Sequence, residues 1–347
     1  MKILIATKSY LFNIIGGGDI QANRTYTNLK KNGIDIRFLD SKTKNIKDFD
    51  ILHIFAPSVF PMDSYAIAKY AHNSGLKVVT SSVFWLPVYK TRMFNILKIN
   101  PINKIAIWAG NFIPMYGPTY LKLLFEKSDM VLPNTNDEKN MIKEVFDISH
   151  NKFTVIPNGV DKEFANGNKN LFNYKYDTND FILFVGRIER RKNLLKLIHA
   201  FKLSELDTDL VIIGSIAESD YYEMCKNAAN KKVKFIGSLD HDSDMLKSAY
   251  KAAKVVVLPS YYETPGLTAL EGGLAGANIA ITNIGGTKEY FEKFVEYINP
   301  YSTLSIKNAI ISAYNRPKNK QLQAHILKNF TWDEVAKKTI KTYRKVL

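Results

Sequence analysis

The segment from Val255 to Glu271 reads VVVLPSYYETPGLTALE, which places an apolar run, a turn and the start of a helix in close succession. An apolar run without alternating polar residues is typical of a strand in a parallel sheet that helices cover on both faces. Pro265 and Gly266 suit a helix entry whose first backbone N–H groups remain exposed. Ligands of such sheets bind beyond the carboxyl ends of the strands, so we expect a site at this turn.

The same alternation of apolar runs and amphipathic segments extends over most of the chain, with a break between Leu86 and Lys127. It predicts two domains, each with a parallel sheet covered by helices, because 347 residues are enough for two domains. The fold class is therefore α/β, with two doubly wound, Rossmann-like domains and a central cleft between them. The expected strands are Lys2–Thr7, Ile34–Leu39, Ile51–Phe55, Lys77–Ser81, Met130–Pro133, Phe153–Ile156, Phe181–Val185, Leu210–Gly214, Val233–Ile236, Val255–Pro259 and Asn278–Thr282.

A polar, asparagine-rich stretch at residues 166–179 separates the two series of strands and predicts a linker. We place the first domain at residues 1–165 and the second at residues 166–331. An amphipathic helix predicted at residues 332–347 ends the chain, and we expect it to pack back on the first domain.

Composition narrows the class of protein. The single cysteine, Cys225, cannot form an intramolecular disulfide, which fits a reducing cytoplasm. The apolar run at the start stops at Lys8 with no small-residue cleavage site, so it is interpreted as a strand and not as a signal peptide. No apolar stretch approaches the roughly 20 residues that cross a bilayer. The net charge of +15 favours anionic partners or, alternatively, reflects a solvated lysine-rich surface.

Two glutamates flank the turn quoted above. Glu263 lies at the mouth of the predicted helix, and Glu271 lies about five residues inside it, or roughly 7–8 Å along the axis. Carboxylates with this spacing can accept hydrogen bonds from hydroxyls at the two ends of an extended ligand, such as a sugar and a ribose. Backbone amides between them can face the phosphates that link those ends.

A second cluster of charge follows the first strand of the second domain. Residues 186–193 read GRIERRKN, and the next helix begins near Asn193. A diphosphate that is held without a metal needs fixed cations, which Arg187 and Lys192 can provide from the carboxyl end of a strand. Taken alone, this segment could equally be a solvated basic loop.

In these segments the chain resembles the retaining glycosyltransferases of family 4, which have the GT-B fold. The resemblance rests on Glu263 and Glu271 separated by seven residues, with Gly266 between them, and on Gly186-Arg187 with Lys192. It spans nearly the whole chain, and its specific part is the second half. Further matching segments are Val155–Asp161, Phe235–Gly237, Ile284–Glu289 and Phe330–Trp332.

The resemblance implies roles for these residues. The catalytic set is Glu263, which contacts the transferred sugar, with Arg187 and Lys192, which hold the diphosphate and stabilise the leaving group. Glu271 is expected to bind the ribose hydroxyls. Such enzymes use a nucleotide-diphosphate sugar as the donor substrate and need no metal or other cofactor. Backbone that binds sugar and phosphate is expected at Pro265, Gly266, Leu267 and Thr268.

Other candidates are less specific. The loop that contains Gly17 and Gly18 faces the donor diphosphate in the family. His53 matches a histidine that the family often has at a strand end, although a core histidine is at least as good an interpretation. Ser82 lies where many members have a catalytic histidine, and a serine can hydrogen-bond but cannot shuttle protons at neutral pH. Asp240 could reach the edge of the nucleotide base.

The segment from Leu86 to Lys127 mixes aromatic and basic residues, with six Lys/Arg against one Glu. This composition suits an anionic lipid surface, although helices packed on the core with outward lysines would show it too. We therefore predict a cytoplasmic enzyme, peripheral on the inner face of the membrane. It would add a sugar to a lipid-linked or cell-envelope glycan acceptor, without a nucleic-acid partner.

Other classes of protein fit less well. A nicotinamide-dependent enzyme could use Asp40, but Gln21 stands where its third glycine would fall. A metal-dependent glycosyltransferase needs an Asp-x-Asp after a strand, whereas those at 48–50, 207–209 and 242–244 precede strands or cap a helix. The charge would suit a nucleic-acid-binding protein, yet no binding module is recognisable. A sugar-nucleotide epimerase of the same fold is the closer alternative and would need no acceptor surface.

Overall fold

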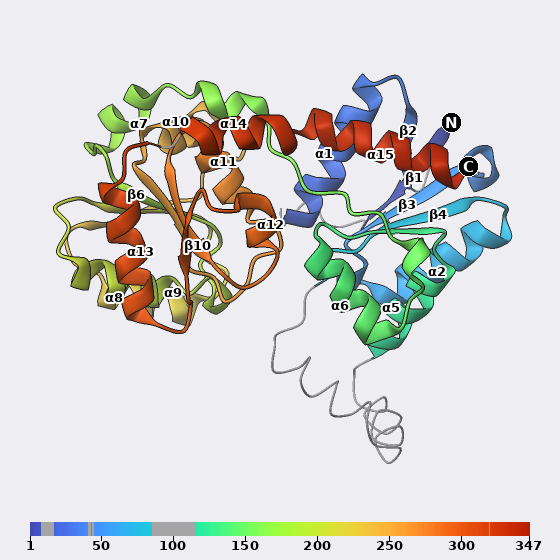
Figure 1. Ribbon diagram of the computed structural model, residues 1–347, viewed down its shortest axis with the longest axis horizontal. Coiled ribbons are helices and arrows are strands. Elements are labelled where there is room, and N and C mark those ends of the chain that lie inside the picture. The colour runs from blue at the N-terminus through green and yellow to red at the C-terminus, as the bar shows by residue number, and fades with distance from the viewer. Residues whose placement is uncertain (8–16, 41–42, 44, 85–115, 319) are drawn as a thin grey trace, which may run out of the picture. The chain divides into compact units, whose positions relative to one another are not determined.

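The computed structural model describes residues 1–7, 17–40, 43, 45–84, 116–318 and 320–347 (Figure 1). The chain divides into two compact units, the first made of Met1–Asn158 and Trp332–Leu347 and the second of Gly159–Thr331. The boundary therefore lies seven residues before the predicted one at 165. The reason is that the 3₁₀ turn η5 (Lys162–Asn166) buries Phe164, 2% exposed, against the core of the second unit.

The first unit is built on a five-stranded parallel sheet of order β2-β1-β3-β4-β5. Its central strands are buried along almost their whole length, as expected for a sheet covered on both faces. The strands are β1 (Lys2–Ala6), β2 (Asp35–Phe38), β3 (Ile51–Phe55), β4 (Lys77–Ser81) and β5 (Met130–Leu132).

Helices cover both faces of this sheet. One apolar cluster joins the sheet to the α1 and C-terminal helices, a second joins it to α2 and α5, and a third joins α5 to α6. The C-terminal helix packs along α1 through Trp332, Val335 and Tyr343, as predicted (Figure 1). The helices are α1 (Gly17–Lys31), α2 (Pro61–Asn73), α5 (Tyr116–Lys127), α6 (Asn136–Phe146) and α15 (Trp332–Val346), with short 3₁₀ turns η2 (Ile46–Asp48), η3 (Pro57–Val59) and η4 (His150–Lys152).

The second unit has a six-stranded parallel sheet of order β11-β10-β9-β6-β7-β8. The chain order changes direction between β6 and β9, which lie side by side although about 70 residues separate them. The strands are β6 (Ile182–Val185), β7 (Leu210–Ile213), β8 (Val233–Gly237), β9 (Val255–Leu258), β10 (Asn278–Thr282) and β11 (Glu296–Ile298).

The two faces of this sheet carry separate apolar clusters. Helices α7, α10, α11 and α14 contribute to one of them, and α8, α9 and α13 contribute to the other. The unit is thus a three-layer α/β domain of the predicted class. The helices are α7 (Lys169–Tyr176), α8 (Leu194–Ser204), α9 (Ser219–Ala228), α10 (Asp244–Ala252), α11 (Leu267–Ala275), α12 (Thr287–Phe291), α13 (Thr303–Asn315) and α14 (Lys320–Asn329).

Two expectations about local structure were wrong. The stretch at 166–179 is not a linker, because it contains α7. Phe172 of this helix is fully buried, and its backbone N–H donates to the Ser248 hydroxyl at 2.8 Å. The run Phe153–Ile156 is not a strand but forms a single bridge to Val131 beside β5. Asparagines obscured the apolar face of α7, and a run of four residues is too short to distinguish a strand from a loop that follows one.

Candidate functional site

Most of the predicted donor residues of the second unit, namely Arg187, Lys192, Glu263 and Pro265–Thr268, lie at the carboxyl ends of two neighbouring strands. From β6 the chain runs through Arg187 and the 3₁₀ turn η6 (Arg190–Lys192) into α8, and from β9 it runs through Glu263 into α11. Both loops are short, so their side chains stay close to the sheet edge. This is the position in which open parallel sheets bind their ligands.

The centre of this cluster is an ion pair between Lys192 and Glu263. Lys192 Nζ donates to Glu263 Oε1 at 2.7 Å, and the two side chains are only 15% and 9% exposed. The Ser260 hydroxyl donates to the same carboxylate oxygen at 2.7 Å. A charged pair this deeply placed needs such additional partners, because burial removes the water that would otherwise solvate it.

The backbone of Glu263 is fixed by the Ile284–Glu289 segment. Its N–H donates to Ile284 O at 3.1 Å, and Gly286 N–H donates to its carbonyl at 3.0 Å. Gly285, at φ +106°, passes so close that a Cβ atom there would lie 1.8 Å from Glu263 O. Only glycine fits at that position.

The charge state of Glu263 follows from these contacts. Burial by itself would raise its pKa. Lys192 and Arg191 act in the opposite direction, as do the hydrogen bonds from Lys192 and Ser260, and the resulting pKa lies below the usual value. Glu263 is therefore a carboxylate at neutral pH that can accept hydrogen bonds but has no proton to donate.

Arg191, which was not among the predicted site residues, completes this cluster. Its guanidinium lies 3.9 Å from Glu263 Oε1 and stacks on the Tyr262 ring at 5.3 Å. Glu189, which is 8% exposed, pairs with both Arg191 at 3.0 Å and Arg187 at 2.8 Å. The Arg187 side chain is still 45% exposed and can turn toward a ligand.

The adjacent Arg190 has a different role. It forms ion pairs with Glu218 at 2.5 Å and with Asp220 at 2.6 Å, and its side chain is 51% exposed. These contacts tie η6 to the region around α9. Of the four cations at 187–192, Arg190 is thus the one bound to acids outside the cluster.

Helix α11 begins at the predicted turn. Gly266 has φ +74° at the N-cap position, and a Cβ atom there would lie 2.9 Å from Ile281 Cδ1. Pro265 and Gly266 are buried, while Leu267 and Thr268 are partly exposed. The Thr268 hydroxyl donates to Val185 O at 3.3 Å, which joins the first turn of α11 to the end of β6. The first backbone N–H groups of the helix, which no preceding turn can bond, lie at the same strand ends.

Glu271 lies in the second turn of α11, where both of its carboxylate oxygens are bonded. His241 Nε2 lies 2.8 Å from Oε1, and the Tyr250 hydroxyl donates to Oε2 at 2.5 Å. Burial opposes the positive charge of His241, but Glu271 and Asp242 outweigh it and raise the pKa of His241 to about 9. His241, which was not among the predicted site residues, is thus an imidazolium at neutral pH.

Asp240 precedes this histidine on the loop after β8. Its carboxylate accepts a hydrogen bond from Asp242 N–H at 2.9 Å, and its carbonyl accepts one from the Ser243 hydroxyl at 2.6 Å. Asp240 therefore shapes the entry into α10, and its side chain is exposed.

The predicted residues of the first unit have different surroundings. Gly17 and Gly18 form the start of α1, and a Cβ atom on Gly18 would lie 3.0 Å from Ala56 Cβ. His53 is 1% exposed and contacts the Tyr343 hydroxyl at 2.6 Å and the Ser81 hydroxyl at 2.9 Å. Burial lowers its pKa to about 3, so it is a neutral core histidine that links β3 to α15.

Ser82 is fully buried and donates to Glu138 Oε1 at 2.5 Å. The Glu138 carboxylate, also fully buried, accepts from Phe84 N–H and Asn134 N–H at 2.7 Å each. This carboxylate joins the ends of β4 and β5 to the start of α6. Helical spacing alone gives no sign that residue 138 faces inward.

Two known families match the sequence. Residues 168–329 match the family described as glycosyl transferases group 1, and residues 17–164 match glycosyltransferase family 4. The first match contains the whole cluster described above, and the second begins at Gly17. Both matches are to glycosyltransferases, and the chain is a glycosyltransferase of the family 4 type.

This glycosyltransferase is similar to several known proteins. It is 30% identical over 237 residues to an uncharacterized glycosyltransferase of Methanocaldococcus jannaschii, a match that covers 63% of this chain and 60% of that protein. It is 28% identical over 270 residues to a glycogen synthase of Mycobacterium tuberculosis, covering 74% of this chain and 63% of that protein. The matches thus span less than two thirds of the length of either relative.

Its fold is that of a solved structure. The crystal structure of Anabaena HepE in complex with UDP and glucose has a TM-score of 0.74 and 15% identity, and the match covers 99% of this chain and 100% of that one. Likeness at this identity concerns the fold, which is GT-B with two Rossmann-like domains.

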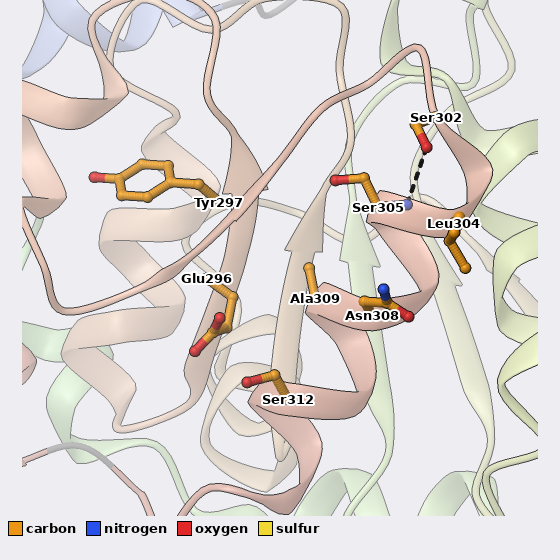
Figure 2. A pocket seen from close by; sticks show the side chains of 8 residues that line it. All are labelled: Glu296, Tyr297, Ser302, Leu304, Ser305, Asn308, Ala309 and Ser312. Atoms are coloured by element: carbon orange, nitrogen blue, oxygen red, sulfur yellow. Dashed lines mark hydrogen bonds between the residues drawn. The ribbon is translucent and has the colours of Figure 1, made fainter.

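A hollow of about 490 Å³ lies elsewhere in the second unit of this glycosyltransferase, between β11 and α13. Figure 2 shows Glu296 and Tyr297 on β11 and the serine and asparagine side chains on the neighbouring helix α13. The Ser302 hydroxyl caps α13 by accepting a hydrogen bond from Ser305 N–H, and the Ser305 hydroxyl accepts one from Asn299 N–H. The full lining is Glu296, Tyr297, Ser302, Leu304, Ser305, Asn308, Ala309 and Ser312, none of them a predicted site residue.

Within the part of the chain that the structure describes, no three His, Cys, Asp or Glu side chains gather where they could hold a metal ion. In the same residues, no helix is long and apolar enough to cross a membrane. The predicted lipid-facing segment Leu86–Lys127 lies outside the described residues up to position 115, and its last 12 residues form α5.

Proposed function

We propose that this glycosyltransferase moves a sugar from a nucleotide-diphosphate sugar to a glycan acceptor, with retention of configuration and without a bound metal. The observation that carries the proposal is the Lys192–Glu263 pair, with Arg187 and Arg191 beside it, at the carboxyl ends of β6 and β9. Anabaena HepE, with its bound UDP and glucose, supports a nucleotide-sugar donor for a chain of this fold.

The charges of the cluster suit a diphosphate. Arg187, Arg191 and Lys192 are balanced only in part by Glu189 and Glu263, so one positive charge is in excess before a ligand binds. Arg187 can exchange its pairing with Glu189 for a phosphate oxygen, since its side chain is nearly half exposed. These cations would stabilise the negative charge that develops on the leaving diphosphate.

Glu263 would bind the sugar, not protonate it. Because Lys192 and Arg191 keep it ionised, it can only accept hydrogen bonds, and the hydroxyls of a hexose are suitable donors. Proton transfer then falls to the leaving phosphate, which can accept the proton of the acceptor hydroxyl. His53 and Ser82 would stay in the scaffold of the first unit.

We propose a lipid-linked or cell-envelope glycan as the acceptor, on the cytoplasmic face of the membrane. The support is the charge of +15 and the basic, aromatic composition of Leu86–Lys127. Co-sedimentation with anionic vesicles at low and high salt tests this. Binding should be salt-sensitive and should fall when four cations are changed to Gln, namely Lys90, Arg92, Lys98 and Lys104. Absence of binding at low salt would point to a soluble acceptor.

The donor assignment is tested by screening nucleotide sugars for thermal stabilisation. A ligand present at one hundred times its dissociation constant should stabilise the protein by about 2.7 kcal/mol. Glu271→Ala should then weaken nucleotide binding, and Glu263→Ala should mainly slow transfer. Wild-type behaviour of both variants would refute the assignment. Conversion of the donor into an isomeric nucleotide sugar without an acceptor would indicate an epimerase instead.

A further inference from the structure

The pair formed by His241 and Glu271 lies outside the diphosphate cluster. In it, neighbouring side chains fix the orientation of the Glu271 carboxylate. Glu271 is on α11, His241 is on the loop after β8, and Tyr250 is on α10, so three elements meet at one carboxylate. The Glu271 side chain is 8% exposed and that of His241 is 22% exposed. The pair is therefore at the edge of the protein interior, where a ligand can reach it.

A carboxylate can accept about four hydrogen bonds, two on each oxygen. His241 occupies one position on Oε1 and Tyr250 occupies one on Oε2, which leaves one position on each oxygen as far as the described residues are concerned. Two free positions on the two oxygens of one carboxylate match the two adjacent hydroxyls of a ribose. If the carboxylate rotated, its two oxygens would no longer face the two hydroxyls, and the hydrogen bonds to His241 and Tyr250 prevent that rotation.

His241 is itself held in place. Its Nδ1 lies 3.1 Å from Asp242 Oδ1, and its ring packs edge-on against Phe164 at a centroid distance of 5.6 Å. The charged groups that face the ring are thus Asp242 on its own loop and Glu271 on α11, with the neutral Tyr250 on α10. Each of its two nitrogens is directed at a carboxylate, and its ring orientation is fixed.

We infer that His241 is a positioning residue for the nucleoside end of the donor: together with Tyr250 it orients Glu271 so that the carboxylate accepts both ribose hydroxyls. This inference rests on the proposed function, since it needs a nucleotide at the second unit. It adds a residue that does not touch the reacting atoms and that acts through Glu271.

The test compares three ligands by calorimetric titration: UDP or GDP, whichever binds the wild type, its 2′,3′-dideoxy analogue, and pyrophosphate. His241→Ala should weaken binding of the nucleoside diphosphate about tenfold, the loss expected for a hydrogen bond to a charged group. Binding of the dideoxy analogue and of pyrophosphate should change by less than about twofold, because neither has the ribose hydroxyls. His241→Gln, whose amide can replace Nε2–H, should recover most of the affinity.

Tyr250→Phe provides a second route to the same effect, since it removes only the hydroxyl that donates to Oε2. His325→Ala is the matched control, because His325 is a partly buried histidine of the same unit that bonds Tyr290 O at 2.9 Å. Equal weakening of all three ligands by His241→Ala, or no weakening of any, would overturn the inference. If neither nucleotide binds the wild type, the proposed function falls and the inference falls with it.

Discussion

The strand ends of the two units differ in how their polar groups are satisfied. In the first unit His53, Ser82 and Glu138 are buried, and each is bonded to groups of the scaffold. In the second unit Lys192 and Glu263 are charged and pair mainly with each other at the edge of the sheet. The buried polar groups of the first unit thus have scaffold partners, whereas in the second unit the charged pair lies at the sheet edge, where we propose that the donor binds.

Two histidines, His53 within β3 and His241 on the loop after β8, show the same difference in their pKa values. Burial without a charged partner lowers the pKa of His53 to about 3, whereas two carboxylates raise the pKa of His241 to about 9 in spite of its burial. A neutral histidine can join two elements of a core. A charged histidine that is partly exposed and bonded to a carboxylate is instead a candidate for a ligand-binding site.

The largest expected effect concerns the cations of the second unit. Changing both Arg187 and Lys192 to Ala should slow sugar transfer at least about a hundredfold, because it removes the donors that stabilise the leaving diphosphate. Arg190→Ala is the control, since Arg190 is paired with Glu218 and Asp220 and should leave transfer unchanged. Transfer should persist in excess chelator. Loss of activity on chelation, restored by magnesium or manganese, would contradict the metal-free mechanism.

Glu138→Gln should show the structural role of the first unit. Among the described residues its carboxylate accepts hydrogen bonds from the Ser82 hydroxyl and from the N–H groups of Phe84 and Asn134, and an amide would turn an N–H group toward one of those donors. We expect the free energy of unfolding to fall by about 3 kcal/mol. Urea denaturation measures this, while nucleotide affinity of the folded protein should stay unchanged. A stable variant with weakened nucleotide binding would reverse the roles assigned to the two units.

The pH dependence of stability should separate the two histidines. His53 is protonated in the unfolded chain below about pH 6.5 but not in the folded one until about pH 3, so stability is lost as pH falls through this interval. Relative to His53→Gln, the free energy of unfolding of the wild type should fall by about 2 kcal/mol between pH 7 and pH 5.

His241 acts in the opposite direction: its contribution to the free energy of unfolding is complete below pH 6.5 and is lost as pH rises through about 9. Thermal melts across pH, with both His→Gln variants, measure both trends, and parallel curves would contradict them.

A smaller effect is expected at Asn193, which carries the turn between η6 and α8. It has φ +60°, and its amide donates to Pro259 O at 3.0 Å and Pro300 O at 2.9 Å. Asn193→Gly keeps the backbone conformation and loses only these bonds, which should cost about 1–2 kcal/mol. Asn193→Ala should cost about 1 kcal/mol more, because alanine disfavours positive φ. Equal stability of the two variants in urea denaturation would show that the positive φ at residue 193 does not destabilise alanine relative to glycine.

The sequence predicted the architecture well because apolar periodicity is a local signal. The strand expected at Asn278–Thr282 has these bounds in the structure, and that at Lys2–Thr7 is one residue shorter. The short edge strand β11 was missed, since Glu296-Tyr297-Ile298 is mixed in polarity and only three residues long. The helix α7 was missed because its asparagines resemble those of a linker.

The site was predictable only where its residues follow strands in sequence. Arg187, Lys192, Glu263 and Glu271 meet that condition. The partners that set their charge and orientation come from elsewhere in the chain: His241 and Glu271 are 30 residues apart, and Lys192 and Glu263 are 71 residues apart. Such pairs depend on which loops the sheet order brings together, and no local pattern contains that order.

The central claim is that the donor nucleotide binds at the carboxyl ends of β6 and β9. Hydrogen–deuterium exchange with and without UDP or GDP tests it directly. We predict slower exchange of the backbone amides at residues 186–193 and 264–271 when the nucleotide is bound. Protection confined to residues 1–158, with no change in these two segments, would contradict the account.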